Sequence, residues 1–482
     1  MKKLFINKKS IDWWFILIIF IYIITRIPFI PLGYGSDGDA WSVATVAKAF
    51  FATGKYESSR PPGNPLFEII NSILDTYGGW YSSNIATLSI SIFLLIVFYK
   101  ILNIIKVNHP KLLLILFTFF PIFWIHSADT MDYLWALLFI MLSWYFLIIK
   151  RHILAALCLG ISVGFRLPGC LFVVPFSVYL YYTSQREKIF IYLIMSTVFS
   201  VISFSLPILT YGIHTFSYYT SPGSEITHLP YYLVTSIGIT SSLITISGLI
   251  IYFPDILKFI REKDPIILTC ISSVVIIFLL FCKVPLERAY LIPLFPFLFI
   301  IMDKFFNKRL FILFIIIAIS YGFIMVEVKD EKSLDEIKIR PHLSTGLVVK
   351  DYLFRKQQME FRRKLFPYFK EKYGNEKKYL IVAGFSLGPE QFFENNMGTA
   401  ITIYDGPYKM KLVRVNGTCI DILPAGINEH WYNYFLRNSY EVIFIEGAIR
   451  ISKLDYQYAL DPKKVNILTI DQIENELSTN SN

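Results

Sequence analysis

The loop around which this chain is organised reads Gly33-Tyr34-Gly35-Ser36-Asp37-Gly38-Asp39-Ala40-Trp41 and continues to Ser59-Arg60-Pro61-Pro62-Gly63-Asn64-Pro65-Leu66-Phe67-Glu68. Its first part carries two carboxylates one residue apart, Asp37 and Asp39, and its second part places Arg60 directly before a rigid Pro-Pro turn. The first strongly apolar segment of the chain, residues 13–30, comes just before the loop. We therefore expect the rest of the chain to form a membrane scaffold for this loop.

The composition is that of a membrane protein. Of the 482 residues, 55% are hydrophobic and only 17% are charged, and the mean hydropathy is +0.52. Several segments run close to 20 apolar residues, the length that crosses the hydrocarbon core of a bilayer. The formal net charge is +10, but much of the basic excess lies in short loops between apolar segments, so it predicts membrane orientation rather than nucleic-acid binding. The cysteines show no disulfide or zinc spacing.

About eleven membrane-spanning helices are predicted. The first covers residues 13–30, and a cleaved signal peptide is the alternative to it. Its length, Arg26 and the lack of a small-residue cleavage site favour an uncleaved span with the N-terminus inside. The other spans are expected at about 84–102, 110–126, 131–149, 153–167, 168–182, 189–213, 231–252, 265–282, 289–302 and 310–326.

Residues 153–182 are counted as two short spans that meet at Arg166 on the outside. Gly164, Pro168 and Gly169 supply a break between them. One long span would instead place the later basic loops outside, against the positive-inside rule.

The first outside loop, residues 32–83, is predicted to hold two amphipathic helices that lie in the membrane interface. The first runs from Asp37 to Thr53, with Asp37 or Ser36 as its cap and Gly54 at its end. The second covers residues 64–74.

The C-terminal third is different in kind. The predicted domains are a transmembrane domain, residues 1–326, and a small α/β domain, residues 327–482, which the span count places outside. A helical pattern covers residues 344–370, and another helix is expected at 428–437. Strands are predicted at 378–383, 400–404, 441–445 and 465–470.

Ionisable residues gather at the outer ends of the predicted spans. Such groups are costly near the hydrocarbon and are usually functional. Acidic groups there could deprotonate an acceptor or hold a divalent cation, and basic groups could hold a phosphate. The combination suits transfer from a phosphate-activated donor embedded in the membrane. The set comprises Asp37, Asp39, Arg60, Glu68, Asp129, Asp132, Arg166, His214, Glu225, His228, Lys283, Glu287 and Arg288.

Four features in order resemble the GT-C superfamily of integral-membrane glycosyltransferases, in the group around protein mannosyltransferases and lipid A aminoarabinose transferases. They are the first loop with its Asp-Gly-Asp and Arg-Pro-Pro-Gly-Asn-Pro segments, the loop from Asp129 to Asp132, the segment Leu159-Gly160-Ile161-Ser162-Val163-Gly164-Phe165-Arg166-Leu167, and the segment Glu287-Arg288-Ala289-Tyr290-Leu291-Ile292-Pro293-Leu294-Phe295-Pro296. The resemblance covers residues 1 to about 326. The tail lacks the Trp-Trp-Asp-Tyr-Gly signature of oligosaccharyltransferases.

The resemblance implies an inverting glycosyltransferase of the cell envelope. Such an enzyme is a multi-pass protein of the plasma (inner) membrane, and it moves a sugar from a polyprenyl-phosphate donor to a lipid, glycan or protein acceptor on the outer face. It implies that an acidic residue of the first outside loop acts as general base, with Asp37 preferred over Asp39. Asp39 and Asp129 would support the base or hold Mg²⁺ or Mn²⁺. Some relatives need a metal and others do not, so both roles stay open. The expected substrate-binding residues are Arg60, Asp129, Asp132, Arg166, Lys283, Glu287 and Arg288. One or both of Lys283 and Arg288 are expected on the donor phosphate, with Arg60 or Arg166 as helpers.

Plainer roles stay open for several of these side chains. Asp37 could simply cap its helix, Arg60 could extend to lipid headgroups, and Arg166 could be a structural arginine paired with Asp129 or Asp132. Two other functions also stay open. A transporter or flippase usually has midplane sites and two similar halves, which are not evident here. A polysaccharide polymerase or ligase usually has its long outside loop late in the chain, whereas here it comes first.

Overall fold

The computed structural model describes residues 12–212, 215–216, 229–284, 287–333, 336–373, 377–383, 398–406, 408–423, 426–445 and 466–469, together with residues 472 and 475. The described residues form two units. The first lies within Met1–Gly35 and Val46–Leu353, and the second within Ser36–Thr45 and Phe354–Asn482. The domain boundary expected at 326/327 stays a prediction.

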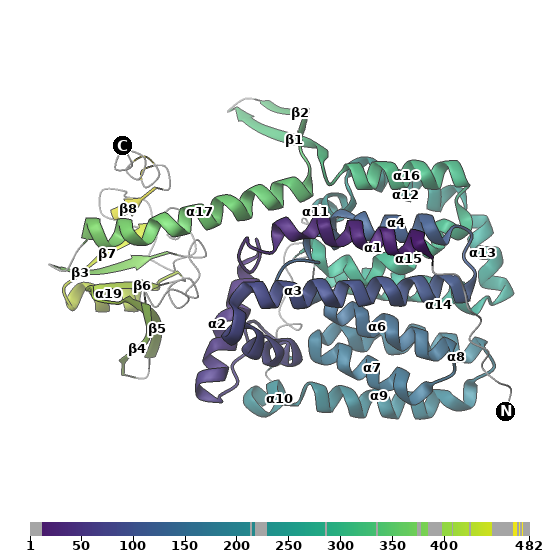
Figure 1. Ribbon diagram of the computed structural model, residues 1–482, viewed down its shortest axis with the longest axis horizontal. Helices are drawn as coiled ribbons and strands as arrows, with labels where there is room; N and C mark the ends of the chain where they lie inside the picture. The colour runs from purple at the N-terminus through teal and green to yellow at the C-terminus, as the bar shows by residue number, and fades with distance from the viewer. Residues whose placement is uncertain are drawn as a thin grey trace. The chain divides into compact units, whose positions relative to one another are not determined.

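Helices make up most of the first unit, and Figure 1 shows them lying side by side. Many begin at a proline in the first turn, where its missing N–H costs nothing. The α-helices are α1 (Trp13–Arg26), α3 (Pro65–Ile105), α4 (Pro110–Phe119), α5 (Pro121–Ile125), α6 (Tyr133–Ile148), α7 (His152–Phe165), α8 (Val173–Tyr182), α9 (Ile189–Ser203), α10 (Ser205–Tyr211), α11 (Leu229–Ile237), α12 (Ile239–Ile251), α13 (Phe253–Glu262), α14 (Pro265–Lys283), α15 (Phe295–Phe305) and α16 (Lys308–Ser320). Short 3₁₀ helices include η1 (Ile27–Phe29), η2 (Leu167–Phe172), η3 (Arg186–Lys188) and η6 (Arg288–Leu294).

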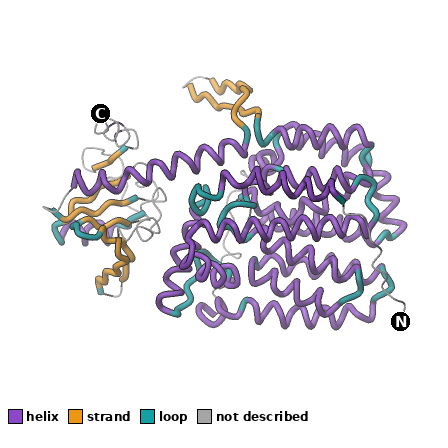
Figure 2. The backbone as a smooth tube through the Cα atoms, in the orientation of Figure 1, coloured by secondary structure: helices purple, strands orange, loops and turns teal. Residues whose placement is uncertain are grey.

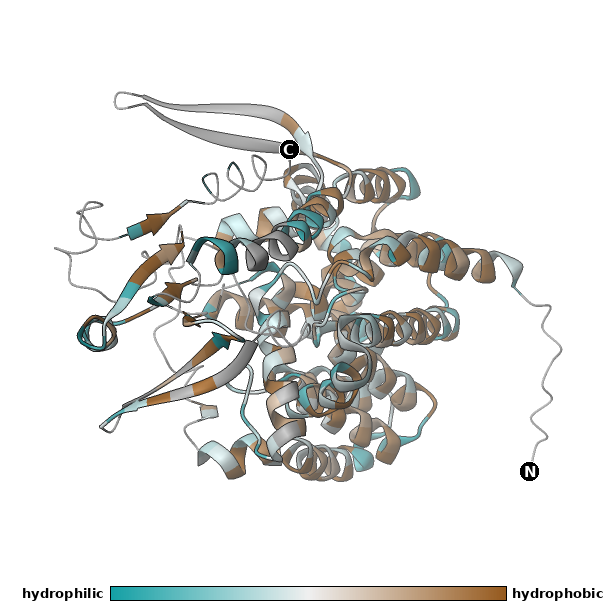
Figure 3. Cartoon of the chain, turned by 60° about the vertical axis from the view of Figure 1, so that its left-hand side comes forward, coloured by the Kyte–Doolittle hydropathy of each residue, from teal (hydrophilic) through white to brown (hydrophobic). Residues whose placement is uncertain are grey.

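Among the described residues, two helices are long and apolar enough to cross a membrane, α3 and α14. Two bent helix pairs, one from Arg186 to Tyr211 and one from Leu229 to Ile251, would raise the number to four. Other apolar helices, such as α6 and α7, are shorter. Figure 3 shows the helices of this unit mostly in the brown of hydrophobic residues. The count of eleven spans stays a prediction.

Several predicted helices differ from the observed ones, and residues 189–213, expected as one span, form α9 and α10, which are bent by 56°. Residues 231–252, expected as one span, form α11 and α12, which are bent by 98°. The bend lies at Gly238, whose φ is +84°. Any other residue at this position would place its Cβ only 2.7 Å from the Tyr321 ring. Residues 64–74 and 84–102, expected as separate helices, belong to α3, which kinks at Gly79 with φ 54° and ψ −146°. At Gly238 and Gly79, glycine permits a backbone angle that other residues rarely adopt.

The break predicted beside Arg166 is present. Helix α7 ends at Phe165, the backbone of Arg166 is extended with φ −151° and ψ 122°, and η2 begins at Leu167. Helix α2 (Gly38–Thr53) also follows its prediction. It ends at Gly54, whose φ is +67° and whose amide donates to the Phe50 carbonyl at 2.8 Å.

An antiparallel hairpin of β1 (Ile324–Ser333) and β2 (Glu336–Thr345) precedes α17 (Leu347–Tyr373). The sequence did not predict the hairpin, although it did predict the helix that follows. Figure 2 shows its strands in orange.

The second unit contains a six-stranded sheet in the order β4-β5-β6-β3-β7-β8. Strand β3 runs parallel to β6 and β7, while β4, β5 and β6 pair antiparallel. Alternate side chains of β3 enter different cores: Ile381 packs with Tyr368 and Phe369 of α17, whereas Leu380 packs with Phe435 of α19. The sheet therefore lies between two helices. The bounds are β3 (Lys378–Val382), β4 (Gly398–Asp405), β5 (Tyr408–Val415), β6 (Ile420–Leu423), α19 (Glu429–Arg437), β7 (Tyr440–Ile445) and β8 (Asn466–Leu468).

Candidate active site

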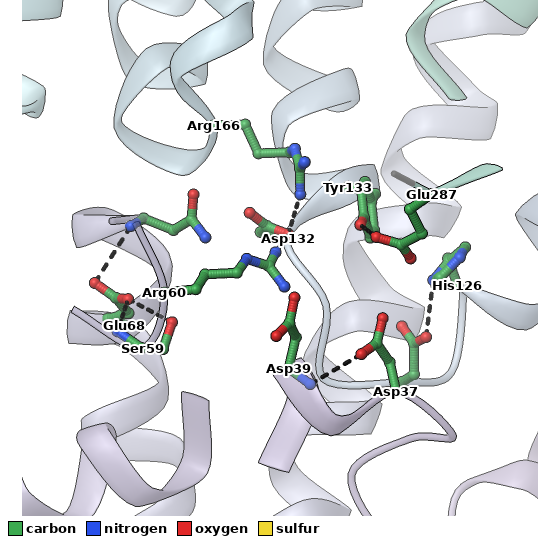
Figure 4. A network of polar contacts seen from close by, with 12 residues as sticks. Asp37, Asp39, Ser59, Arg60, Glu68, His126, Asp132, Tyr133, Arg166 and Glu287 are labelled. Atoms are coloured by element: carbon green, nitrogen blue, oxygen red, sulfur yellow. Dashed lines mark hydrogen bonds and ion pairs between the residues drawn. The ribbon is translucent and has the colours of Figure 1, made fainter. Parts of the chain in front are cut away.

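Asp132 lies at the centre of a polar cluster in the first unit. Its Oδ1 atom accepts from Nη2 of Arg60 and from Nη1 of Arg166, both at 2.8 Å. The Asp132 side chain is fully buried, and the side chains of Arg60 and Arg166 are 16% and 13% exposed. Figure 4 shows the two guanidinium groups converging on this carboxylate from different parts of the chain. Of the pairings left open for Arg166, the one with Asp132 is observed.

The loop that carries Arg60 is held by Glu68, in the first turn of α3. Oε1 of Glu68 accepts from the amide and the hydroxyl of Ser59 at 2.7 and 2.6 Å. Oε2 accepts from the Tyr56 hydroxyl at 2.5 Å and from the Asn64 amide at 3.3 Å. Burial and the negative charge of Glu68 raise the pKa of Tyr56 above its usual value, so the phenol stays a donor. Glu68 thus fixes both ends of the segment around Arg60.

Two further contacts hold the same loop from α10 and the residues after it. The Ser58 amide donates to the Tyr211 hydroxyl at 2.9 Å, and the Thr215 hydroxyl donates to the Pro62 carbonyl at 2.7 Å. The Arg60 loop is therefore anchored on two sides.

Asp132 lies in the segment between α5 and α6, and Thr130 anchors that segment to neighbouring elements. The Thr130 amide donates to the Tyr34 carbonyl at 2.6 Å, and its hydroxyl donates to Ser83 at 2.8 Å and to Asn84 at 3.1 Å. The side-chain amide of Asn84 donates in turn to the Gly33 carbonyl at 2.8 Å. These contacts fix the backbone from which the Asp132 carboxylate projects.

Arg166 also lines a narrow, largely apolar pocket. Its guanidinium carbon lies 4.0 Å from the ring centre of Tyr133 and 5.2 Å from that of Tyr290. The pocket has an empty volume of about 510 Å³, the open space around it included. Its apolar lining includes Ala136, Ile140, Phe172, Ile277, Leu280, Val284 and Pro293. A cation beside two aromatic rings at an apolar pocket suits an anionic head with a hydrocarbon tail.

Two further polar pairs lie beside this pocket. The Tyr133 hydroxyl donates to Glu287, and Nδ1 of His126 lies 2.8 Å from Oδ2 of Asp129. The His126 and Tyr133 rings lie 4.9 Å apart, which joins the two pairs into one group. His126 was not among the predicted site residues, although its position three residues before Asp129 was a usable signal.

The remaining predicted site residues are placed as follows. Lys283 is exposed at the end of α14. Arg288, half-buried, begins η6 and lies within electrostatic reach of His126. Neither lines the apolar pocket. His214, Glu225 and His228 lie outside the described residues.

Asp37 and Asp39 lie at the start of α2, in the segment Ser36–Thr45. The Asp39 amide donates to Oδ1 of Asp37 at 2.9 Å. Asp37 therefore caps the helix, as predicted, and its carboxylate is held by the first turn.

The donor set gives a possible metal ion little support. Within the part of the chain that the structure describes, no three His, Cys, Asp or Glu side chains gather as a metal site would require. One carboxylate oxygen of Asp129 is engaged by His126. The metal roles expected for Asp39 and Asp129 stay a prediction.

Comparison with known proteins places the fold. No family model and no curated protein matches the sequence. Among solved structures, the chain is similar to ArnT from Cupriavidus metallidurans bound to undecaprenyl phosphate, with a TM-score of 0.51 and 11% identity over 96% of this chain and 90% of that one. The apo state of ArnT from the same organism aligns with a TM-score of 0.42 and 13% identity, over 74% of this chain and 65% of that one. The predicted resemblance is confirmed at the level of the fold: the chain is largely helical, with apolar helices, and its fold is like that of ArnT.

Proposed function

We propose that this protein is an inverting glycosyltransferase that moves a sugar from a polyprenyl-phosphate donor to an acceptor on the outer face of the plasma membrane. The observation that carries the proposal is the position of Arg166. Its guanidinium lies over the Tyr133 ring and beside Tyr290 at an apolar pocket, and Asp132 joins it to a second cation, Arg60.

The donor would bind with its prenyl chain in the apolar pocket and its phosphate at the arginines. Arg166 has five N–H donors, of which Nη1 is used on Asp132, so others are available for phosphate oxygens. The two arginines would stabilise the charge that builds up on the phosphate when the bond from the sugar carbon to the phosphate oxygen breaks. This assigns the donor phosphate to Arg166 and Arg60 rather than to Lys283 or Arg288.

The general base is proposed to be Asp37, as the resemblance implies. Capping holds its carboxylate in one orientation, which suits a group that must accept a proton from the acceptor hydroxyl. Asp37 caps α2 from outside its first turn, whereas Asp39 lies within that turn, so Asp39 would serve a different role. The acceptor would be a lipid, a glycan or a protein.

The test is to incubate the purified protein with a panel of polyprenyl-phosphate sugars and to measure both sugar transfer and the release of polyprenyl phosphate. Arg166→Lys should raise the donor KM or lower kcat, because lysine cannot copy the planar stacking of arginine on tyrosine. Arg186→Lys is the matched control, since Arg186 also stacks on a tyrosine, Tyr181, but is exposed and away from the pocket. Movement of an intact donor across vesicles, without cleavage, would favour a flippase instead.

A further inference from the structure

Asp132 brings two arginines, Arg60 and Arg166, to one carboxylate oxygen. Both guanidinium groups bind the same oxygen of Asp132, so their donating nitrogens lie no more than twice 2.8 Å apart. The other oxygen, Oδ2, is buried and has no hydrogen-bond partner among the described residues. Among the described residues the contacts of Asp132 are thus made through one oxygen, to two cations, which points to a role of its charge and its position.

We propose that Asp132 is a positioning residue that holds Arg60 and Arg166 at a single phosphate position and limits their charge, so that the phosphate product can leave. This inference rests on the proposed function. Two guanidinium groups this close repel each other in a buried site, and the shared carboxylate makes their approach possible. The three side chains together carry one net positive charge.

The charge balance matters because transfer changes the charge of the phosphate. The donor is a phosphodiester with one negative charge. The acceptor oxygen forms the new bond to the sugar carbon, the electron pair of the broken bond stays on the phosphate oxygen, and the acceptor proton goes to the base. The product is a phosphate monoester with a charge of about −1.5 to −2 at neutral pH.

Arginines without Asp132 would therefore hold the product more tightly than the donor, and release would slow. With Asp132 present, the single net positive charge matches the donor and attracts the product less strongly than two charges would. Asp132 would thus lower product affinity without touching the reacting atoms.

The experiment measures equilibrium binding of two probes, farnesyl phosphate and its methyl diester, to the full-length protein in detergent. Asp132→Asn should bind farnesyl phosphate at least about tenfold more tightly, as removal of a nearby buried negative charge implies. The gain should be smaller for the diester, which carries less charge. In transfer assays the same variant should lower both the donor KM and kcat, with product inhibition at lower concentration.

The double variant Asp132→Asn with Arg60→Gln restores the single positive charge and should return binding of farnesyl phosphate toward the wild-type value. Weaker binding by Asp132→Asn at an unchanged unfolding temperature, or equal gains for both probes, would overturn the inference.

Should Asp132→Asn fail to fold, Arg60→Gln alone gives the answer, because it leaves the cluster neutral and should weaken binding of the monoester more than that of the diester. An equal loss for both would contradict the charge argument. Absence of any binding by the wild-type protein would instead count against the proposed function.

Discussion

Glu68 is predicted to be the residue that keeps Arg60 in place. Its carboxylate is 2% exposed and accepts four hydrogen bonds from Tyr56, Ser59 and Asn64. Hydrogen bonds to a charged acceptor contribute about 1.5–3 kcal/mol each, and they are not additive. Glu68→Gln keeps one acceptor oxygen but turns an NH₂ group toward a buried backbone N–H. We therefore expect a loss of about 2–4 kcal/mol from the stability of the loop.

Graded variants separate the contributions to this loop. Ser59→Ala removes only one hydroxyl donor from Oε1 and should cost about 1 kcal/mol, whereas Glu68→Ala leaves several buried donors unpaired and should cost more than Glu68→Gln. The assays are thermal unfolding in detergent, limited proteolysis between residues 54 and 64, and the donor KM. In all three assays the effect should increase in the order Ser59→Ala, Glu68→Gln, Glu68→Ala.

Two outcomes would refute this reasoning. If Glu68→Gln shows wild-type proteolysis and wild-type unfolding, the carboxylate does not hold the loop. If the loop becomes sensitive to protease while the donor KM stays unchanged, the loop does not position Arg60 for the donor.

Three other expectations can be checked directly. Asp37→Asn should lower turnover by about 10²–10⁴ with little change in donor binding, while Asp39→Asn should change any metal dependence. The opposite pattern would mean that the two residues have each other's roles. If both variants stay active, the general base does not lie in this loop. Burial and the hydrogen bond to Asp421 raise the pKa of Tyr440 to about 12. The contribution of Tyr440 to the stability of the second unit should therefore be full below pH 10 and be lost as the pH rises to about 12, and Tyr440→Phe should remove this part of the pH dependence from denaturation curves. Cys419 is exposed and should react with an impermeant maleimide in intact cells, with Cys419→Ser as control; labelling only after permeabilisation would contradict an outside tail.

Local signals in the sequence predicted the elements that depend on local chemistry. Gly164 and Pro168 predicted the break at Arg166, and Asp37 predicted its own cap. The bend at Gly238 was not predicted, because a single glycine in an apolar run does not indicate the angle between the helices on its two sides. Strand β5 was not predicted, although residues 409–415 alternate charged and apolar side chains for most of their length. This alternation is typical of a strand and would have been a usable signal.

The pairings within the site could not be derived in the same way. Arg60 and Asp132 are 72 residues apart, and Arg166 follows 34 residues later, so only the packing of α3, α6 and α7 brings them together. The sequence could say that ionisable groups at span ends gather on one face. It could not say that Asp132 would take both arginines, or that Lys283 would lie outside the pocket.

This distinction explains why the two arginines rather than the late basic residues hold the centre of the cluster. A cation buried against hydrocarbon needs a partner that offsets its desolvation, and both arginines share one in Asp132. Arg166 gains further stabilisation from the faces of Tyr133 and Tyr290. Lys283, exposed at a helix end, needs no such partner and is held in no fixed geometry by water. We therefore expect a phosphate-binding site in a membrane protein of this kind to lie where a largely buried arginine has a carboxylate and aromatic neighbours, rather than where basic residues are most numerous in the sequence.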